Sequence, residues 1–284
     1  MFNTVSVETN VKMTERINRD AGQGEATAGR HRFIDLDGND TGGHQVIFPI
    51  LKQVLGGTFQ LIGTGFFVSS CGLFASAKHV LLDCFDKSGD QKYPICIVQF
   101  LPDNQFQFRH ILWCASHNTA DVAIGLIEPT IDDEPNKALT LSTAAPSIGG
   151  TVATYAYPKT EISQDDYSQV LNFKAAFYDG QLVEYLSNGR DRVLLPGPCY
   201  RTSMVIHRGA SGGPVVGKSG RVLAINSTGY DGQCDISFVS RIDEVLHLKI
   251  PYIKLPSGQE VSSVTILDLA RAGWVDLEQQ LTGE

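Results

Sequence analysis

One serine stands in a glycine-rich segment, Arg208-Gly209-Ala210-Ser211-Gly212-Gly213-Pro214. Glycine permits positive φ and leaves no side chain in the path of an approaching substrate. The backbone N–H groups of Gly209 and Ser211 can then point to one spot beside the Ser211 hydroxyl, as a developing oxyanion requires. We interpret the segment as a nucleophilic serine with its oxyanion hole; a plain glycine-rich hairpin turn is the structural alternative.

A serine hydroxyl becomes a good nucleophile only when a base removes its proton. Among seven histidines, His79 is the strongest candidate, because it follows the apolar run 73–77 where the chain turns outward. A carboxylate must then hold the imidazole in one tautomer and stabilise its charged form. Asp121, directly before the apolar run 122–127, is the candidate, and a simple turn aspartate at the start of a strand is the alternative.

The elements that must position these residues are short. Runs rich in β-branched and aromatic residues, each bounded by turn formers, predict strands at 45–50, 63–68, 73–77, 95–100, 122–127, 151–156, 214–216 and 222–225. Many short strands without a long helical period predict a sandwich or barrel.

Helical and loop signals are few. Ser240 as N-cap, with Asp243 three residues later, predicts one short helix, and apolar spacing predicts another within 264–274. The polar, acidic stretch 160–167 predicts an exposed loop, and the charge cluster 190–192 predicts a solvated turn.

Composition limits the class of protein. The 284 residues include 23 Lys and Arg against 31 Asp and Glu, a net charge of -8, which excludes a generally basic nucleic-acid binder. No apolar run approaches the roughly 18 residues that cross a bilayer, and residues 1–30 lack the apolar core of a secretory signal. Six cysteines without a CxxC pair favour reduced thiols. We therefore expect a cytoplasmic protein with neither nucleic acid nor membrane as a partner.

The candidate residues and their surroundings resemble the trypsin-like (chymotrypsin-fold) serine proteases. The resemblance rests on Gly-Thr-Gly-Phe-Phe-Val at 63–68, Ala-Lys-His at 77–79, Asp-Val-Ala at 121–123 and Gly-Ala-Ser-Gly-Gly-Pro at 209–214, in the family's order of His, Asp and Ser. It covers roughly residues 45 to 250. It implies an all-β fold of two antiparallel six-stranded β-barrels, with His79 and Asp121 on the first barrel and Ser211 on the second.

We expect three parts along the chain. Residues 1–44 form a flexible N-terminal arm, and residues 45–250 form the protease domain, whose two barrels divide near 130–150. Residues 251–284 form a C-terminal extension with a short helix.

Two departures from the digestive-type members place the chain closer to bacterial, HtrA-like proteases. Ala210 stands where those members carry an aspartate that pairs with a newly cut N-terminus, and no cysteine adjoins His79. The stretch after residue 250 is too short for a PDZ module, so the resemblance is to an HtrA-like protease domain alone.

The resemblance also suggests how substrate binds. Ser227-Thr228-Gly229 resembles the segment whose backbone pairs with substrate; an ordinary strand end is the alternative. Val205 stands six residues before Ser211, at the base of the family's primary pocket, where a neutral residue favours an apolar or small side chain. His207, with Arg208, would instead favour an acidic one, unless His207 is only a loop residue.

The implied function is that of a serine endopeptidase. It would hydrolyse peptide bonds in protein or peptide substrates through an acyl-enzyme, with no metal or other cofactor. A catalytically silent module that binds a peptide or partner on the same fold is the alternative. Regulation by a protein partner, acting through residues 1–30, is a further hypothesis.

Overall fold

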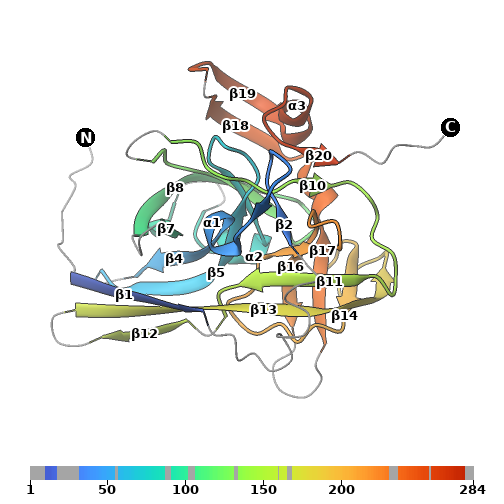
Figure 1. Cartoon of the computed structure of the whole chain (residues 1–284), viewed down its shortest axis with the longest axis horizontal. Coiled ribbons are helices and arrows are strands. Elements are labelled where there is room, and N and C mark those ends of the chain that lie inside the picture. Colours follow the sequence, from blue (N-terminus) through green and yellow to red (C-terminus); the bar gives the residue numbers. More distant parts are fainter. Residues whose placement is uncertain are drawn as a thin grey trace.

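Six antiparallel strands from the first half of the chain close into a barrel (Figure 1). The computed structural model describes residues 10–17, 32–54, 57–86, 91–101, 106–130, 134–158, 160–164, 168–229, 236–255 and 257–278. Around this first barrel the strands pair in the order β4 (Ile47–Gln53), β5 (Phe59–Phe67), β6 (Leu73–Ser76), β9 (Ala123–Ile127), β8 (Phe106–Ser116) and β7 (Ile95–Phe100).

Aromatic rings fill the interior of the first barrel. The ring centroid of Phe48 lies 4.7 Å from that of Phe67 and 5.9 Å from that of Phe74, and all three side chains are buried. Gly125 leaves room for them, because a Cβ there would lie 2.4 Å from the Phe74 ring. Small residues opposite large ones allow the close packing that makes a rigid support for the strand ends.

Six further antiparallel strands form a second closed ring. They pair in the order β11 (Thr151–Ala156), β13 (Ser168–Leu186), β14 (Cys199–Thr202), β17 (Ser237–Arg241), β16 (Val222–Gly229) and β15 (Pro214–Val216). The ring closes because β15 pairs with both β11 and β16. The expected all-β fold of two antiparallel six-stranded barrels is therefore confirmed.

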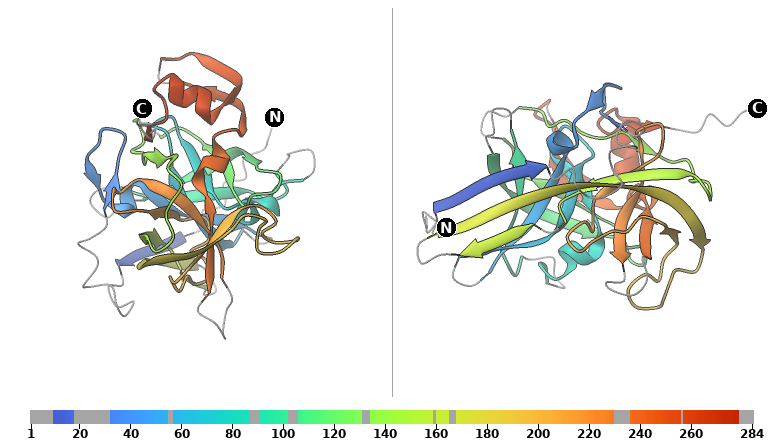
Figure 2. Two further views of the ribbon diagram at one scale, coloured as in Figure 1. Left: turned by 90° about the vertical axis from the view of Figure 1, so that its right-hand side faces the viewer. Right: turned by 60° about the horizontal axis from the view of Figure 1, so that its bottom comes forward.

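The long strand β13 extends beyond the second barrel. Its first half pairs in parallel with β1 (Asn10–Ile17) on one side and antiparallel with β12 (Glu161–Gln164) on the other (Figure 2). The loop predicted at 160–167 is therefore partly a strand, because the free edge of β13 offers backbone partners to residues 161–164.

Other parts of residues 1–44 form β2 (Phe33–Ile34), β3 (Asp40–Thr41) and the start of α1 (Gly43–Val46). Residues 1–9 and 18–31 of the predicted arm lie outside the described part of the chain.

The C-terminal extension contains a hairpin of β18 (Lys249–Lys254) and β19 (Glu260–Thr265), followed by helix α3 (Ile266–Arg271). Thr265 and Asp268 form a capping box, with Asp268 N–H donating to Thr265 Oγ1 at 3.1 Å. The predicted short C-terminal helix is confirmed. After it, β20 (Leu277–Glu278) pairs with β10 (Leu141–Ser142).

The other predicted helix is a 3-10 turn, η2 (Ile242–Val245), and its N-cap is Arg241 without a side-chain hydrogen bond. The prediction of Ser240 as the N-cap was wrong, because Ser240 pairs with Cys199 inside the sheet. None of the helices in the described ranges is long and apolar enough to span a bilayer.

Candidate active site

His79 and Asp121 meet at one end of the first barrel. Strands β6 and β9 pair with Ser76 opposite Ala123, so the residues just beyond these strand ends lie together. His79 belongs to the short helix α2 (Lys78–Leu82) that follows β6. Its Nδ1 lies 2.8 Å from Asp121 Oδ2, and its backbone N–H donates to Asp121 Oδ1 at 2.9 Å. When Nδ1 carries the proton and donates it in this hydrogen bond to the carboxylate, Nε2 is the basic nitrogen of the ring.

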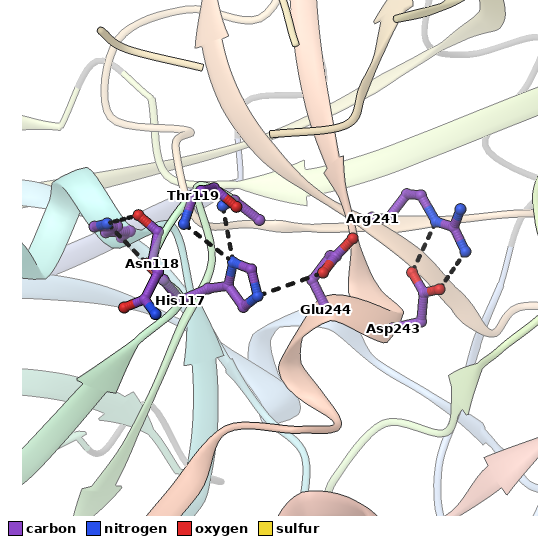
Figure 3. A network of polar contacts seen from close by, with 8 residues as sticks. His117, Asn118, Thr119, Arg241, Asp243 and Glu244 are labelled. Atoms are coloured by element: carbon purple, nitrogen blue, oxygen red, sulfur yellow. Dashed lines mark hydrogen bonds and ion pairs between the residues drawn. The ribbon is translucent and has the colours of Figure 1, made fainter. Parts of the chain in front are cut away.

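A polar network fixes the loop that carries Asp121 (Figure 3). Lys78 Nζ donates to the carbonyls of His117 and of its neighbour, at 2.7 and 2.9 Å. His117 Nδ1 accepts the N–H of Ala120 at 2.9 Å, and its Nε2 lies 3.6 Å from Glu244 Oε2. Glu244 belongs to η2, directly after β17, so the network ties this loop to both barrels.

Asp121 receives a further donor from the second barrel. Its side chain is only 4% exposed, and the hydroxyl of Ser227 in β16 donates to its Oδ2. A buried carboxylate needs such donors, because a buried charge without partners is strongly unfavourable. Two hydrogen bonds from His79 and one from Ser227 therefore hold the charge where the barrels meet.

The Ser211 hydroxyl lies in the same cluster with a different acceptor. Among the described contacts, its Oγ donates to the carbonyl oxygen of Ser227 at 2.8 Å rather than to His79. The structure thus brings His79 and Asp121 into direct contact and links Ser211 to them through Ser227. For the hydroxyl proton to reach the imidazole, this hydrogen bond to Ser227 O must break.

Residues 207–210, just before the serine, form a tight turn. Ala210 N–H donates to His207 O at 3.1 Å, and Gly209, the third residue, has φ of +94°. Positive φ at the third position is the mark of a type II turn, in which the central peptide is rotated by about 180° relative to type I. The turn type therefore decides where the Gly209 N–H points, and glycine is the residue that this φ favours.

Thr64 of β5 holds the serine loop from the first barrel. Its side chain is fully buried, and its Oγ1 donates to Gly209 O at 2.9 Å. The same Oγ1 accepts Tyr157 N–H at 3.2 Å, and Thr64 N–H donates to Ser211 O at 2.8 Å. A Cβ at Gly212 would lie 2.1 Å from Thr64 O, so the loop packs directly on the β5 backbone.

Asn226 of β16 fixes the loop from the second barrel. Gly212 N–H donates to Asn226 O at 2.8 Å. The buried side-chain amide donates to Thr154 Oγ1 at 2.7 Å and to Ala210 O at 3.2 Å. Thr64 and Asn226 thus clamp the two sides of the loop, a role that the sequence analysis did not assign to either residue.

The residues expected to bind substrate lie in different settings. Val205 is 41% exposed, and Gly229 ends β16 where its register with β17 shifts. His207 is half-buried, with its Nδ1 3.1 Å from the Tyr178 hydroxyl. Burial raises the pKa of that phenol to about 12, so Tyr178 keeps its proton at neutral pH.

Thr228 is held by a nearly buried arginine. Arg190 Nη1 donates to Thr228 Oγ1 at 2.7 Å, and its guanidinium lies 5.1 Å from the centre of the Phe238 ring and pairs with Asp191. The Arg190 side chain is only 9% exposed, so the interpretation of 190–192 as a solvated turn was wrong for this residue.

A cavity of about 610 Å³ opens beside His79. It is bounded by residues of β4, β5, α2 and β12 and by residues 207–209 of the turn before the serine. The segment 227–229 contributes nothing to its lining.

The five described cysteines carry free thiols, and Cys234 lies outside the described residues. Burial raises the pKa of Cys96 and of Cys114 to about 12, which keeps both thiols protonated and unreactive. Within the described ranges, no three His, Cys, Asp or Glu side chains gather in a way that could hold a metal ion.

A family model described as the trypsin-like peptidase domain matches residues 63–225, more than half of the chain. The chain belongs to the trypsin-like peptidase family. It is accordingly a serine protease whose substrates are proteins or peptides, and the family that the sequence motifs indicated is confirmed.

Solved structures of other proteases are similar to parts of this chain. Deg5 superposes with a TM-score of 0.51 at 17% identity, over 71% of this chain and 86% of that one. The active form of the Rv3671c protease from M. tuberculosis superposes with a TM-score of 0.50 at 18% identity, over 71% of this chain and 78% of that one. The HtrA-type protease AlgW with tripeptide has a TM-score of 0.49 at 18% identity, over 70% of this chain and 57% of that one. No curated protein matches the chain significantly.

Proposed function

We propose that this serine protease is an endopeptidase with Ser211 as nucleophile, His79 as general base and Asp121 as the group that orients His79. The contact between His79 Nδ1 and the buried Asp121 carboxylate, at 2.8 Å, is the observation that carries the proposal. It leaves Nε2 basic, and it stabilises the imidazolium that forms when Nε2 takes a proton.

The reaction then follows from the roles of these groups. His79 Nε2 takes the Ser211 proton while Oγ attacks the peptide carbonyl carbon, and the carbonyl electron pair moves onto its oxygen. The imidazolium gives the proton to the leaving nitrogen as the C–N bond breaks, which leaves Ser211 acylated. Water, deprotonated by His79, attacks the ester, and the serine regains its proton as the acid product leaves.

The N–H groups of Gly209 and Ser211 are proposed to stabilise the oxyanion. Support comes from the positive φ of Gly209 and from the hydrogen bond of its carbonyl to Thr64, which together fix the orientation of this turn. Losing one such donor typically raises the barrier by about 3–4 kcal/mol.

Substrate is proposed to pair with the backbone of Ser227–Gly229 in β fashion. The hydrogen bond from Arg190 to Thr228 supports this assignment, because it holds the segment in place. Val205 and His207 are proposed to contact the side chain before the cleaved bond.

Regulation by a partner is the second part of the proposal. The observation in its favour is the hydrogen bond from Ser211 Oγ to Ser227 O, in which the hydroxyl proton is directed at that carbonyl and not at His79. A ligand that favours donation of the Ser211 proton to His79 would raise activity by shifting the population away from the arrangement bonded to Ser227 O. Full-rate hydrolysis by the isolated chain would exclude this regulation.

The test of the proposed chemistry is hydrolysis of a proteome-derived peptide library by the wild-type chain and by Ser211→Ala. We expect cleavage by the wild type and none by the variant, with unchanged circular dichroism. Ser219→Ala, outside the cluster, is the matched control and should cleave as the wild type does. Turnover retained in Ser211→Ala contradicts the assignment, and peptide binding by the wild type without cleavage supports the silent binding module instead.

A further inference from the structure

The cavity beside His79 has walls of predominantly basic charge. Lys52 of β4 and Arg208 of the turn before the serine line it, against one carboxylate, Asp83. Among the described residues, no ion pair includes any of these three side chains. The Lys52 ammonium lies 4.9 Å from the centre of the Tyr93 ring, a cation–π contact that holds the charge in place without neutralising it.

The position of the cavity indicates which part of a substrate would enter it. His79, which protonates the leaving nitrogen in the proposed mechanism, lines the cavity together with Gly209. The segment 227–229, which is proposed to hold the residues before the cleaved bond, does not. The cavity therefore faces mainly the residues that follow the cleaved bond, and His207 is the one residue of its lining that is also proposed to contact the side chain before that bond.

Part of the wall is apolar. Leu61, Ile62, Val80 and Ile162 contribute aliphatic side chains beside the two cations. A glutamate fits this combination, since its methylene groups can contact the aliphatic wall while its carboxylate faces Lys52 and Arg208.

We propose that this cavity is a subsite for an acidic side chain on the C-terminal side of the cleaved bond. The inference rests on the proposed function, because that mechanism assigns the leaving group to this side of the site. Partly exposed ion pairs are individually weak, so the expected preference for Glu over Gln is modest, about fivefold at low salt. Raising the salt concentration should reduce this preference for Glu over Gln.

The test measures binding, so that it does not depend on turnover. Two pools of hexapeptides, amidated at the C-terminus and varied at all but one central position, carry Glu or Gln at that position. Their affinity is measured by competition on the Ser211→Ala protein. We expect the Glu pool to bind about fivefold more tightly, and Lys52→Glu in the same background to abolish the difference. Asp83→Asn should increase it, and Lys218→Gln, an exposed cation outside the cavity lining, should leave it unchanged.

Equal binding of the two pools, failure to bind either, or a preference that survives Lys52→Glu overturns the proposal. A third pool, with Gln at the central position and a free C-terminal carboxylate, shows whether the cavity binds the carboxylate of a side chain or that of a chain terminus. If this pool binds as the Glu pool does, the site takes a chain terminus and the side-chain assignment is wrong. Failure of the proposed function gives a different result, in which the wild type hydrolyses none of the pools while the binding preference remains.

Discussion

Replacing Thr64 with valine tests whether the first barrel positions the serine loop. Valine keeps the shape of the side chain but removes the hydroxyl that donates to Gly209 O at 2.9 Å and accepts Tyr157 N–H at 3.2 Å. Tyr157 N–H is left unpaired in a buried site and Gly209 O in a partly buried one, and an unpaired buried group costs about 1–3 kcal/mol. We therefore expect the free energy of unfolding to fall by about 2–4 kcal/mol.

The same substitution should reduce catalysis, because a released Gly209 carbonyl no longer holds the turn that orients the oxyanion N–H. Complete loss of one oxyanion donor costs about 100- to 1000-fold in kcat, so a loosened turn should cost about 10- to 100-fold, with KM little changed. Urea denaturation and steady-state peptide hydrolysis measure the two effects. Thr64→Ser keeps both hydrogen bonds and loses one methyl group, at about 1 kcal/mol. If Thr64→Val retains the kcat of Thr64→Ser, the loop does not depend on this contact.

Three other predictions concern buried polar groups. Ser227→Ala removes a donor to the Asp121 carboxylate, worth about 1.5–3 kcal/mol, so kcat should fall by about 10- to 100-fold in peptide hydrolysis; an unchanged kcat refutes the role. Arg109 is fully buried and donates to Glu128 O and Asn136 Oδ1, so Arg109→Met leaves these two oxygens without this donor. Urea denaturation should show that the free energy of unfolding falls by about 2–4 kcal/mol, and a fall below about 0.5 kcal/mol contradicts this. The pKa of about 12 for Cys96 and for Cys114 lies above the ordinary thiol value of 9.0, so above pH 9 the unfolded state releases protons that the folded thiols keep. The free energy of unfolding should therefore fall between about pH 9 and 12, and the buried Cys96 should react with a thiol reagent only in urea; rapid labelling of Cys96 in the native protein at pH 8, located by peptide mass spectrometry, contradicts this.

The protease family and several strands are predictable from sequence because their signals are local. Strands β7, β11 and β15 have the boundaries that their β-branched runs predicted. Ser211 lies among glycines whose positive φ values at 209 and 212 the motif implied. The order of His79, Asp121 and Ser211 then indicated the family.

What could not be predicted depends on contacts between residues far apart in the chain. The hydrogen bond between Thr64 and Gly209 joins residues separated by 145 positions, and no spacing rule specifies it. The charge cluster around Arg190 resembles a solvated turn until Thr228 and Phe238 cover the guanidinium. Strand β12 likewise forms only because β13 supplies a free edge.

Covalent labelling with a fluorophosphonate probe tests most directly whether an imidazole activates a serine in this protein. The account predicts a single adduct, located on Ser211 by peptide mass spectrometry and lost in His79→Ala. It also predicts slower labelling in Asp121→Asn, because the histidine is then held less well in its basic tautomer. An adduct on another serine, or labelling of Ser211 at the same rate without the imidazole of His79, would contradict the account.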